Sequence, residues 1–293
     1  MRKIHILGNC QVGGIADSIS LLFDDIEVER EIHTFDIPAL SAVLEKHLES
    51  QGFLIACDSV KALIATNQSL TKFQLSENIY FPTISFAAFH PDIQYVFADG
   101  SVVKNGLGGD WNSRILLWAY LNGLSQPSAQ ELFCEETFDE LGYFNEWNRS
   151  NVDLEKSFLQ TGFDYSRWIR RVKRSGVFMY GINHPNPIAL SELSVQLAEK
   201  IFPNLNARSI NLNGLTSDYL SHIVWPIYPE IGDRLSLEGS YLWRASKIIC
   251  DLNKFTELCY KTYDDIDLRN QNLRFIPLMT DSDDEILKAK AKV

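Results

Sequence analysis

One segment near the N-terminus combines a nucleophilic side chain with a sharp turn. Residues 4–14 read Ile-His-Ile-Leu-Gly-Asn-Cys-Gln-Val-Gly-Gly, an apolar strand that ends in a turn and opens a helix. The first turn of a helix directs free N–H groups and a partial positive charge at whatever lies over it. A thiol placed there ionises more easily than a free one, and the same amides can hold an oxyanion. We therefore predict that Cys10 takes part in chemistry, with the amide side chains of Asn9 and Gln11 as uncharged donors beside it.

Two common glycine motifs do not fit this turn. A dinucleotide fingerprint needs G-x-G-x-x-G, whereas the glycines here are Gly8, Gly13 and Gly14. A phosphate loop needs Lys and Ser or Thr after its last glycine, and Ile15 follows Gly14 instead. The plain alternative, in which Cys10 packs beneath the first helical turn as a small apolar side chain, stays open.

A thiol nucleophile needs a base, and two histidines are placed to supply one. His90 and His184 each follow a predicted strand and each precede a proline, which disfavours helix at the histidine itself. If both strands run parallel to the first, both imidazoles lie at the same edge of the sheet as Cys10. The residues alone do not choose between the two.

The elements that must position these side chains alternate between strand and helix in the first third of the chain. This βαβαβ rhythm predicts an α/β fold with a parallel sheet of the flavodoxin or SGNH type, in which ligands lie at the carboxyl ends of the strands. Periodicity places strands at residues 3–7, 27–35, 53–57 and 78–86, and helices at residues 11–23 and 37–50.

The rest of the chain divides into three further parts. Residues 1–111 form the first part of the α/β core, and residues 112–175 show helical periodicity that predicts an insertion or cap. Residues 176–205 return to the core with a strand at 176–180 and a helix at 188–201, and we expect them to join the first sheet. Residues 206–293 are expected to hold a helical region at 215–262 and a polar tail from residue 281.

Composition excludes several classes of protein. The 293 residues are 45% apolar, and 27 Lys and Arg against 38 Asp and Glu give a formal charge of −11, which disfavours nucleic acid as a partner. No apolar run reaches the roughly 20 residues that span a bilayer, so a cytoplasmic location is expected. Five cysteines without C-x-x-C spacing argue against a disulfide scaffold and a metal site. We predict that the other four cysteines, at positions 57, 134, 250 and 259, are small buried side chains.

Two family resemblances follow from these motifs. The first turn, with Cys in place of Ser, and the block from Gly181 to Ile201 resemble SGNH-type hydrolases and acyltransferases, although Gly181 stands where their orienting Asp would be. A fuller resemblance is to the WcbI-type capsular polysaccharide biosynthesis family. It covers most of the chain and rests on four motifs: Gly-Asn-Cys-Gln at 8–11, His-Pro-Asp at 90–92, Asn-His-Pro at 183–185 and Gly-Ser-Tyr-Leu at 239–242.

The WcbI-type resemblance implies a coenzyme A-dependent acetyltransferase that decorates a sugar of a capsular or other surface polysaccharide. It implies that Cys10 is the reactive or acyl-contacting thiol, with Asn9 and Gln11 beside it and Gln11 also next to the cofactor. His90 with Asp92, and His184, would supply the base and its orientation. An acetylated Cys10 and direct activation of the hydroxyl by histidine are both open.

Coenzyme A carries phosphates, so an acidic chain must offer it a local group of cations. Four arginines at i, i+3, i+4 and i+7 would share one helix face and could bind phosphates through their guanidinium forks, namely Arg167, Arg170, Arg171 and Arg174. The alternatives are a solvated face paired with acidic neighbours and a site for an anionic sugar polymer.

Two other functions stay open beside the acetyltransferase. Water in place of the sugar hydroxyl would make the protein a thiol-based carbohydrate esterase or deacetylase, and loss of chemistry would leave a carbohydrate-binding protein. A homo-oligomer is possible. The sequence does not identify the acceptor sugar or the position that is modified.

Overall fold

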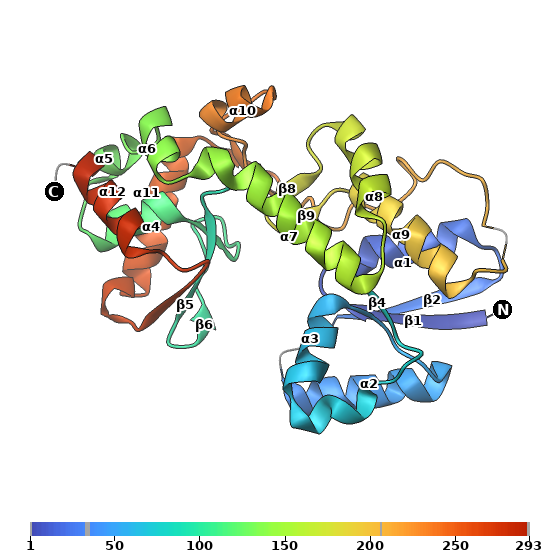
Figure 1. Ribbon diagram of the computed structural model, residues 1–293. Coiled ribbons are helices and arrows are strands. Elements are labelled where there is room, and N and C mark those ends of the chain that lie inside the picture. Colours follow the sequence, from blue (N-terminus) through green and yellow to red (C-terminus); the bar gives the residue numbers. More distant parts are fainter. Residues whose placement is uncertain (1, 33–35, 206, 292–293) are drawn as a thin grey trace. The chain divides into compact units, whose positions relative to one another are not determined.

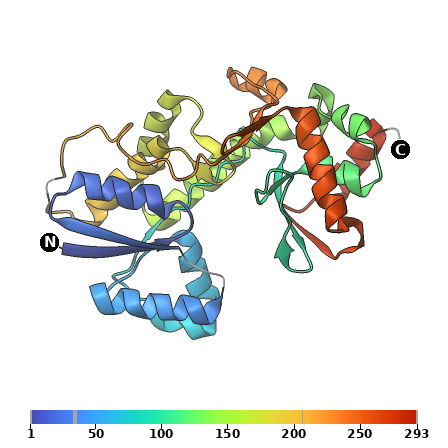
Figure 2. The same ribbon diagram turned by 180° about the vertical axis from the view of Figure 1, so that it is seen from behind.

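The computed structural model describes residues 2–32, 36–205 and 207–291, and the chain forms two compact units (Figures 1 and 2). The first unit comprises residues 1–85, 151–179 and 183–221, and the second comprises residues 86–150, 180–182 and 222–293. The chain therefore passes between the units at other places than the predicted boundaries at 111, 175 and 205.

The first unit is built on a parallel sheet, which confirms the predicted α/β fold. Its four strands, in the order β2-β1-β3-β4, are β1 (Arg2–Gly8), β2 (Ile26–Ile32), β3 (Ile55–Cys57) and β4 (Ile79–Phe81). In the register of the first pair, Gly8 lies opposite Ile32. The predicted strand 27–35 thus ends at Ile32, and its residues 33–35 lie outside the described residues. The carboxyl ends of the parallel strands meet at one edge of this sheet.

Helices cover both faces of the parallel sheet, with α1 and α9 on one face and α2 and α3 on the other (Figure 1). The helices of this unit are α1 (Val12–Leu22), α2 (Ile37–Gln51), α3 (Asp58–Thr66), α8 (Tyr165–Val172) and α9 (Pro187–Ile201), with 3-10 turns at Gln68–Phe73 and Lys173–Ser175. Gly14 lets α1 approach α9, because a Cβ there would lie 2.6 Å from Leu190 Cδ1. The α8 helix is fixed to α9 by Trp168, whose Nε1 donates to Ala189 O at 2.9 Å.

Two predicted strands differ from the structure. Residues 176–180 do not join the parallel sheet: β8 (Met179–Gly181) pairs with β9 (His184–Pro185) in a separate two-stranded sheet. The predicted strand 78–86 is the short β4, which ends before Pro82 because proline cannot donate to a strand ladder. The apolar run that continues to Phe86 has no regular secondary structure.

The second unit contains two antiparallel sheets and short helices. One sheet has the order β13-β5-β6 with β7 on β5, and the other the order β10-β11-β12. The strands are β5 (Ile93–Ala98), β6 (Ser101–Val102), β7 (Trp111–Ser113), β10 (Ile223–Val224), β11 (Trp243–Ala245), β12 (Ile248–Cys250) and β13 (Leu273–Ile276). The helices that lie wholly in it are α4 (Arg114–Leu121), α5 (Gln126–Gln130), α6 (Glu135–Glu140), α10 (Pro229–Leu235), α11 (Leu252–Asp265) and α12 (Asp281–Ala291), with 3-10 turns at Tyr143–Asn145 and Leu268–Asn270. The α7 helix (Glu146–Thr161) contributes residues to each unit.

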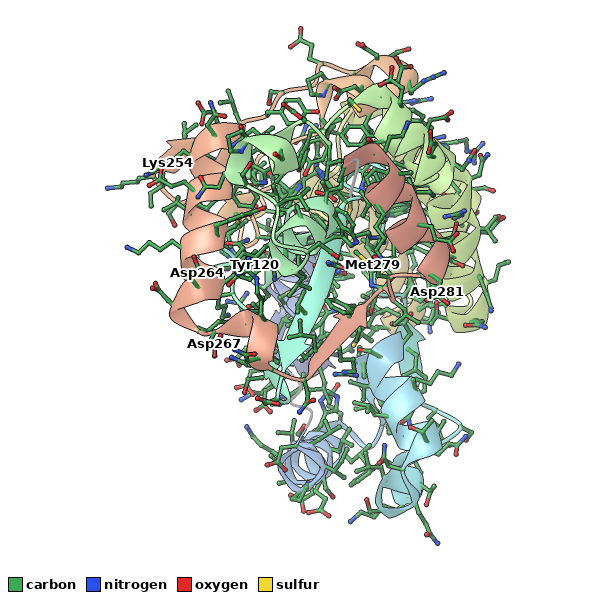
Figure 3. The ribbon with its side chains drawn as sticks, turned by 90° about the vertical axis from the view of Figure 1, so that its left-hand side faces the viewer. Tyr120, Lys254, Asp264, Asp267, Met279 and Asp281 are labelled. Atoms are coloured by element: carbon green, nitrogen blue, oxygen red, sulfur yellow. The ribbon has the colours of Figure 1, made fainter. Side chains whose placement is uncertain are left out.

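The helical character predicted for residues 112–175 is present, but two predictions for the C-terminal part are wrong. Residues 215–262 contain β10, β11 and β12 as well as α10 and α11. The predicted polar tail is the helix α12, which begins at Asp281 (Figure 3) and packs against α4 and α6. Its Leu287 is buried, and Asp284 Oδ1 accepts from Trp118 Nε1 at 2.8 Å. Acidic residues in its first turn and lysines in its last turn suit the helix dipole.

Candidate functional site

Cys10 lies in the turn between β1 and α1, as the sequence predicts. Asn9 closes this turn, since Gln11 N donates to its side-chain Oδ1 at 3.0 Å and Val12 N donates to its main-chain O at 3.2 Å. Gly8 is required just before it, because a Cβ there would lie 2.6 Å from Val12 Cγ1. In the described chain no side chain caps the first turn of α1. Cys10 is partly exposed and lies two residues before Val12, the first residue of α1.

The prediction that the Cys10 thiol ionises easily is wrong for the protein on its own. Burial is the main cause that raises the pKa of Cys10 above its usual value, and the nearby thiol of Cys57 acts in the same direction. A hydrogen bond from a main-chain N–H lowers this pKa, but by less. Desolvation disfavours the thiolate more than the helix terminus favours it. The thiol is therefore mainly protonated at neutral pH.

Gln11 holds the turn against two other segments of the first unit. Its Nε2 donates to Ile84 O at 2.8 Å and to Asn183 O at 3.0 Å, and its Oε1 accepts from Ile84 N at 3.0 Å. The side chain is 1% exposed, and both of its N–H groups are used. The predicted role as a donor to substrate or cofactor therefore does not fit Gln11, which positions the site instead.

The side chain of Asn9 also has partners. Its Nδ2 lies 3.5 Å from Thr83 Oγ1, and Thr83 in turn donates to Asp58 Oδ1 through its N at 3.1 Å and its Oγ1 at 2.6 Å. Ser157 Oγ donates to the other oxygen of Asp58. Asp58 follows β3 directly, so a carboxylate that the sequence analysis did not single out stabilises the same edge of the sheet.

His184 lies beside the Cys10 turn through Gln11, although not by the predicted route. The prediction places it after a strand of the parallel sheet, whereas it lies in β9, two residues before Asn186, which caps α9. The hydrogen bond from Gln11 to Asn183 O ties the residue before His184 to the Cys10 turn. The first unit thus brings Cys10 and the His184 segment to one place.

His90 lies in the second unit and is almost wholly buried. It precedes β5, where the prediction has it directly after a strand, and is 2% exposed. Its Nδ1 lies 3.2 Å from Pro226 O, and its main-chain N donates to Ala87 O at 2.8 Å. These contacts give His90 a structural role within its unit, and its part in catalysis stays a prediction.

Asp92 does not orient His90, which corrects the role that the resemblance implies. Its carboxylate is fully buried, and Tyr143 OH and Ile115 N each donate to Oδ1 at 3.0 Å, while Tyr228 OH donates to Oδ2 at 2.8 Å. Burial raises the pKa of Asp92, although these donors oppose the rise. A buried carboxylate with such donors stabilises the core of the second unit.

The predicted basic face on α8 is largely neutralised by α9. Arg167 makes a two-pronged ion pair with Glu199, with both N–O distances 2.7 Å, and Arg171 Nη1 lies 3.0 Å from Glu192 Oε2. Arg170 Nε donates to Ser166 O within its own helix. Arg174 lies beyond the end of α8, in a 3-10 turn, so the fourth arginine does not continue the helix face. A role for the four in cofactor binding stays a prediction.

Arg30 is a cation at the first turn of α1, close after Cys10 along the chain, that the sequence analysis missed. Its guanidinium lies over the ring of Tyr219, 4.4 Å from the centroid, and its Nη1 is 2.8 Å from where a Cβ on Gly13 would be. The Tyr219 hydroxyl bonds to the Asp17 carboxylate of α1. Arg30 has no carboxylate partner among the described residues. Its place near the end of the second strand of a βαβ unit was the available signal.

All five cysteines are free, and of the four predicted to be buried, Cys134 is partly exposed. Within residues 2–32, 36–205 and 207–291, no group of His, Cys, Asp and Glu is arranged to hold a metal ion. Over the same residues, no helix is long and apolar enough to cross a membrane.

Comparison with known proteins identifies the family. The profile of the polysaccharide biosynthesis enzyme WcbI matches residues 3–205. A solved structure of WcbI is similar to this chain, with a TM-score of 0.64 over 99% of this chain and 95% of that one. That structure is of the native protein without a disulfide bond between coenzyme A and a cysteine. At 11% identity this likeness supports the fold. No curated protein matches the sequence. The chain belongs to the WcbI family of polysaccharide biosynthesis enzymes.

Proposed function

We propose that the protein is a coenzyme A-dependent acetyltransferase that acetylates a sugar hydroxyl during polysaccharide biosynthesis. The observation that carries the proposal is the partly exposed thiol of Cys10 next to a turn where Arg30 has no carboxylate partner among the described residues. A disulfide bond between coenzyme A and a cysteine is named for the similar WcbI protein, which supports coenzyme A as the ligand.

The residues around Cys10 fit the negative charge of coenzyme A. Arg30 offers a guanidinium fork to phosphate, and the ring of Tyr219 holds it in place. Gly13 leaves room for this guanidinium at the first turn of α1, where the N–H groups favour negative charge. We assign the phosphates to Arg30 first, and to Arg170 and Arg174 as further candidates, since Arg167 and Arg171 are already paired.

Bound acetyl-CoA would supply the acetyl group as an activated thioester. The raised pKa of Cys10 favours the route in which histidine activates the sugar hydroxyl and Cys10 with its neighbouring N–H groups holds the acyl oxygen. His184 is the first candidate for the base, because Gln11 ties its segment to the Cys10 turn. In the other route Cys10 would lose its proton to that base and take up the acetyl group as the C–S bond of acetyl-CoA breaks. The coenzyme A thiol would leave with the proton from the base, and the sugar hydroxyl would then take the acetyl group from Cys10.

Thermal unfolding with and without coenzyme A tests the proposal. At about 100 times the dissociation constant, a ligand stabilises the folded protein by about 2.7 kcal/mol, so the melting temperature should rise measurably. No rise at millimolar coenzyme A would refute the proposal. Release of acetate from nitrophenyl acetate without such a rise would instead favour an esterase that uses the same thiol.

A further inference from the structure

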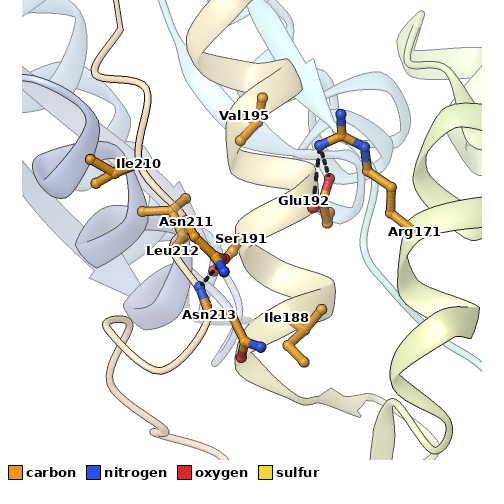
Figure 4. A pocket seen from close by; sticks show the side chains of 9 residues that line it. All are labelled: Arg171, Ile188, Ser191, Glu192, Val195, Ile210, Asn211, Leu212 and Asn213. Atoms are coloured by element: carbon orange, nitrogen blue, oxygen red, sulfur yellow. Dashed lines mark hydrogen bonds and ion pairs between the residues drawn. The ribbon is translucent and has the colours of Figure 1, made fainter.

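A hollow in the first unit lies between α9, the end of α8 and the segment 210–213 (Figure 4). Its volume is about 210 Å³, and it is lined by polar side chains from all three segments together with aliphatic ones. It does not include Cys10, Arg30 or His184.

The charges in this hollow compensate each other. Arg171 and Glu192 are its charged lining residues, and they face each other as an ion pair with Nη1 3.0 Å from Oε2 (Figure 4). A phosphate or carboxylate ligand would have to compete with Glu192 for the guanidinium. The pair can instead offer donors and acceptors to a neutral ligand without leaving a charge unpaired.

Amide groups on the segment 210–213 have capacity for further hydrogen bonds. Asn211 Oδ1 accepts from Asn213 N at 3.0 Å, which leaves the Asn211 N–H groups available. The side-chain amide of Asn213 has no hydrogen bond to any described residue. Asparagine provides both donors and acceptors, as sugar hydroxyls require.

The hydroxyl of Ser191, on the α9 side of the hollow, has spare acceptor capacity. Ser191, Ser18 and Thr216 lie 3.0 to 3.1 Å from one another, and Ser18 Oγ also lies 2.7 Å from Gly14 O. These are four contacts, whereas three hydroxyls hold three protons, so at least one contact lacks a donor. A ligand hydroxyl could supply one more proton to this cluster.

Aliphatic side chains complete a surface that suits a sugar ring. Ile188, Val195, Ile210 and Leu212 provide apolar contacts among the polar groups. A sugar ring has the same mixture, with hydroxyls at its edge and C–H groups on its faces. Burial of those C–H groups against aliphatic carbon adds a favourable contribution.

The hollow continues into a neighbouring one of about 300 Å³. The two share Arg171, Val195 and Ile210, and the second is again charge-compensated on its α8 side by the pair of Arg167 with Glu199. Together they form a groove along α9 with room for more than one sugar ring. We call it the α9 groove.

We propose that the α9 groove binds a neutral, hydroxyl-rich oligosaccharide, apart from the thiol at which the transfer takes place. The acceptor would then be an oligomeric or polymeric sugar rather than a single activated one. The inference rests on the proposed function for the assignment of this sugar as the acceptor.

Calorimetric titration of the full chain with defined sugars tests the proposal. The probes are chitotetraose, mannotetraose and isomaltotetraose, each at about 5 mM, where a dissociation constant in the millimolar range is measurable. N-acetylglucosamine, mannose and glucose serve as single-ring probes, and tetragalacturonate as the anionic probe. We expect at least one neutral tetrasaccharide to bind more tightly than its monosaccharide and than tetragalacturonate.

Two variants locate the binding. Asn213→Ala and Glu192→Gln should each weaken the tetrasaccharide at least about fivefold, a change of roughly 1 kcal/mol. Gln68→Ala, which removes an exposed amide elsewhere in the same unit, should leave it unchanged. The proposal is overturned if no neutral tetrasaccharide binds, if tetragalacturonate binds best, or if both variants bind as wild type does. Melting with coenzyme A, measured in parallel on all variants, reports separately on the proposed function.

Discussion

The Cys10 turn and the α8 face differ in how their cations are compensated. The sequence places four arginines between residues 167 and 174, yet α9 carboxylates pair with Arg167 and Arg171. The candidate cation near the Cys10 turn is Arg30, and no described carboxylate pairs with it. A count of arginines along a sequence therefore overestimates an anion site wherever a neighbouring helix supplies carboxylates. A single guanidinium held by an aromatic ring can be the stronger candidate.

Removal of the Cys10 thiol should have the largest effect on turnover. Cys10→Ala is expected to lower acetyl transfer about 10²-fold or more, because in the proposed route the thiol helps to hold the acyl oxygen. Turnover measured with acetyl-CoA and an acceptor sugar gives the result, and Cys250→Ala, a buried cysteine of the second unit, is the matched control. Unchanged turnover in Cys10→Ala would remove the thiol from the mechanism.

The two histidines should respond differently. His184→Ala is expected to lower turnover by more than tenfold with little change in melting temperature, because a general base contributes ~10²–10⁴-fold. The main effect of His90→Ala should be a lower melting temperature, because the substitution leaves a buried cavity and removes the imidazole from Pro226 O. Turnover and melting curves of both variants separate the two roles. A stable His90→Ala protein without turnover would reverse the assignment.

Loss of the guanidinium at the Cys10 turn should weaken cofactor binding to a smaller extent. Arg30→Ala is expected to raise the dissociation constant of coenzyme A about tenfold, as for a lost charge-assisted hydrogen bond of about 1.5 kcal/mol. Arg30→Lys should recover part of this affinity, because the charge remains but the fork is lost. No change in Arg30→Ala would place the phosphates elsewhere, whereas equal affinity of the wild type for dephospho-coenzyme A would exclude only a contact with the 3′-phosphate.

The smallest effect should come from the paired arginine of α8. Arg167→Ala is expected to change the affinity for coenzyme A less than about twofold and the free energy of unfolding by less than about 1 kcal/mol, the range of exposed ion pairs. Titration and urea unfolding measure both values. A larger loss of coenzyme A affinity in Arg167→Ala than in Arg30→Ala would restore the α8 face as the cofactor site.

Local patterns were sufficient to predict the first part of the fold. The alternation of apolar runs with helical spacing located the first three strands and the two helices between them, because neighbouring elements of a βαβ unit are also neighbours in the sheet. The turn at Cys10 followed from the same rhythm. The α12 helix could also have been found, since acidic residues precede Leu287 and lysines follow it.

Pairing between distant segments could not be predicted from such patterns. Nothing local distinguishes a strand that joins the parallel sheet from β8, which pairs with β9. The partners of Gln11 are Ile84 and Asn183, 73 and 172 residues away along the chain. Burial of the Cys10 thiol, which reverses the predicted direction of its pKa shift, likewise depends on tertiary packing.

A crystal structure of the protein with coenzyme A tests the central claim most directly. We predict that the thiol end of coenzyme A lies at Cys10 and that its phosphates contact the Arg30 guanidinium, with the ion pairs of Arg167 and Arg171 intact. Phosphates on the α8 face, with those ion pairs broken, or a cofactor thiol remote from Cys10 would contradict the account.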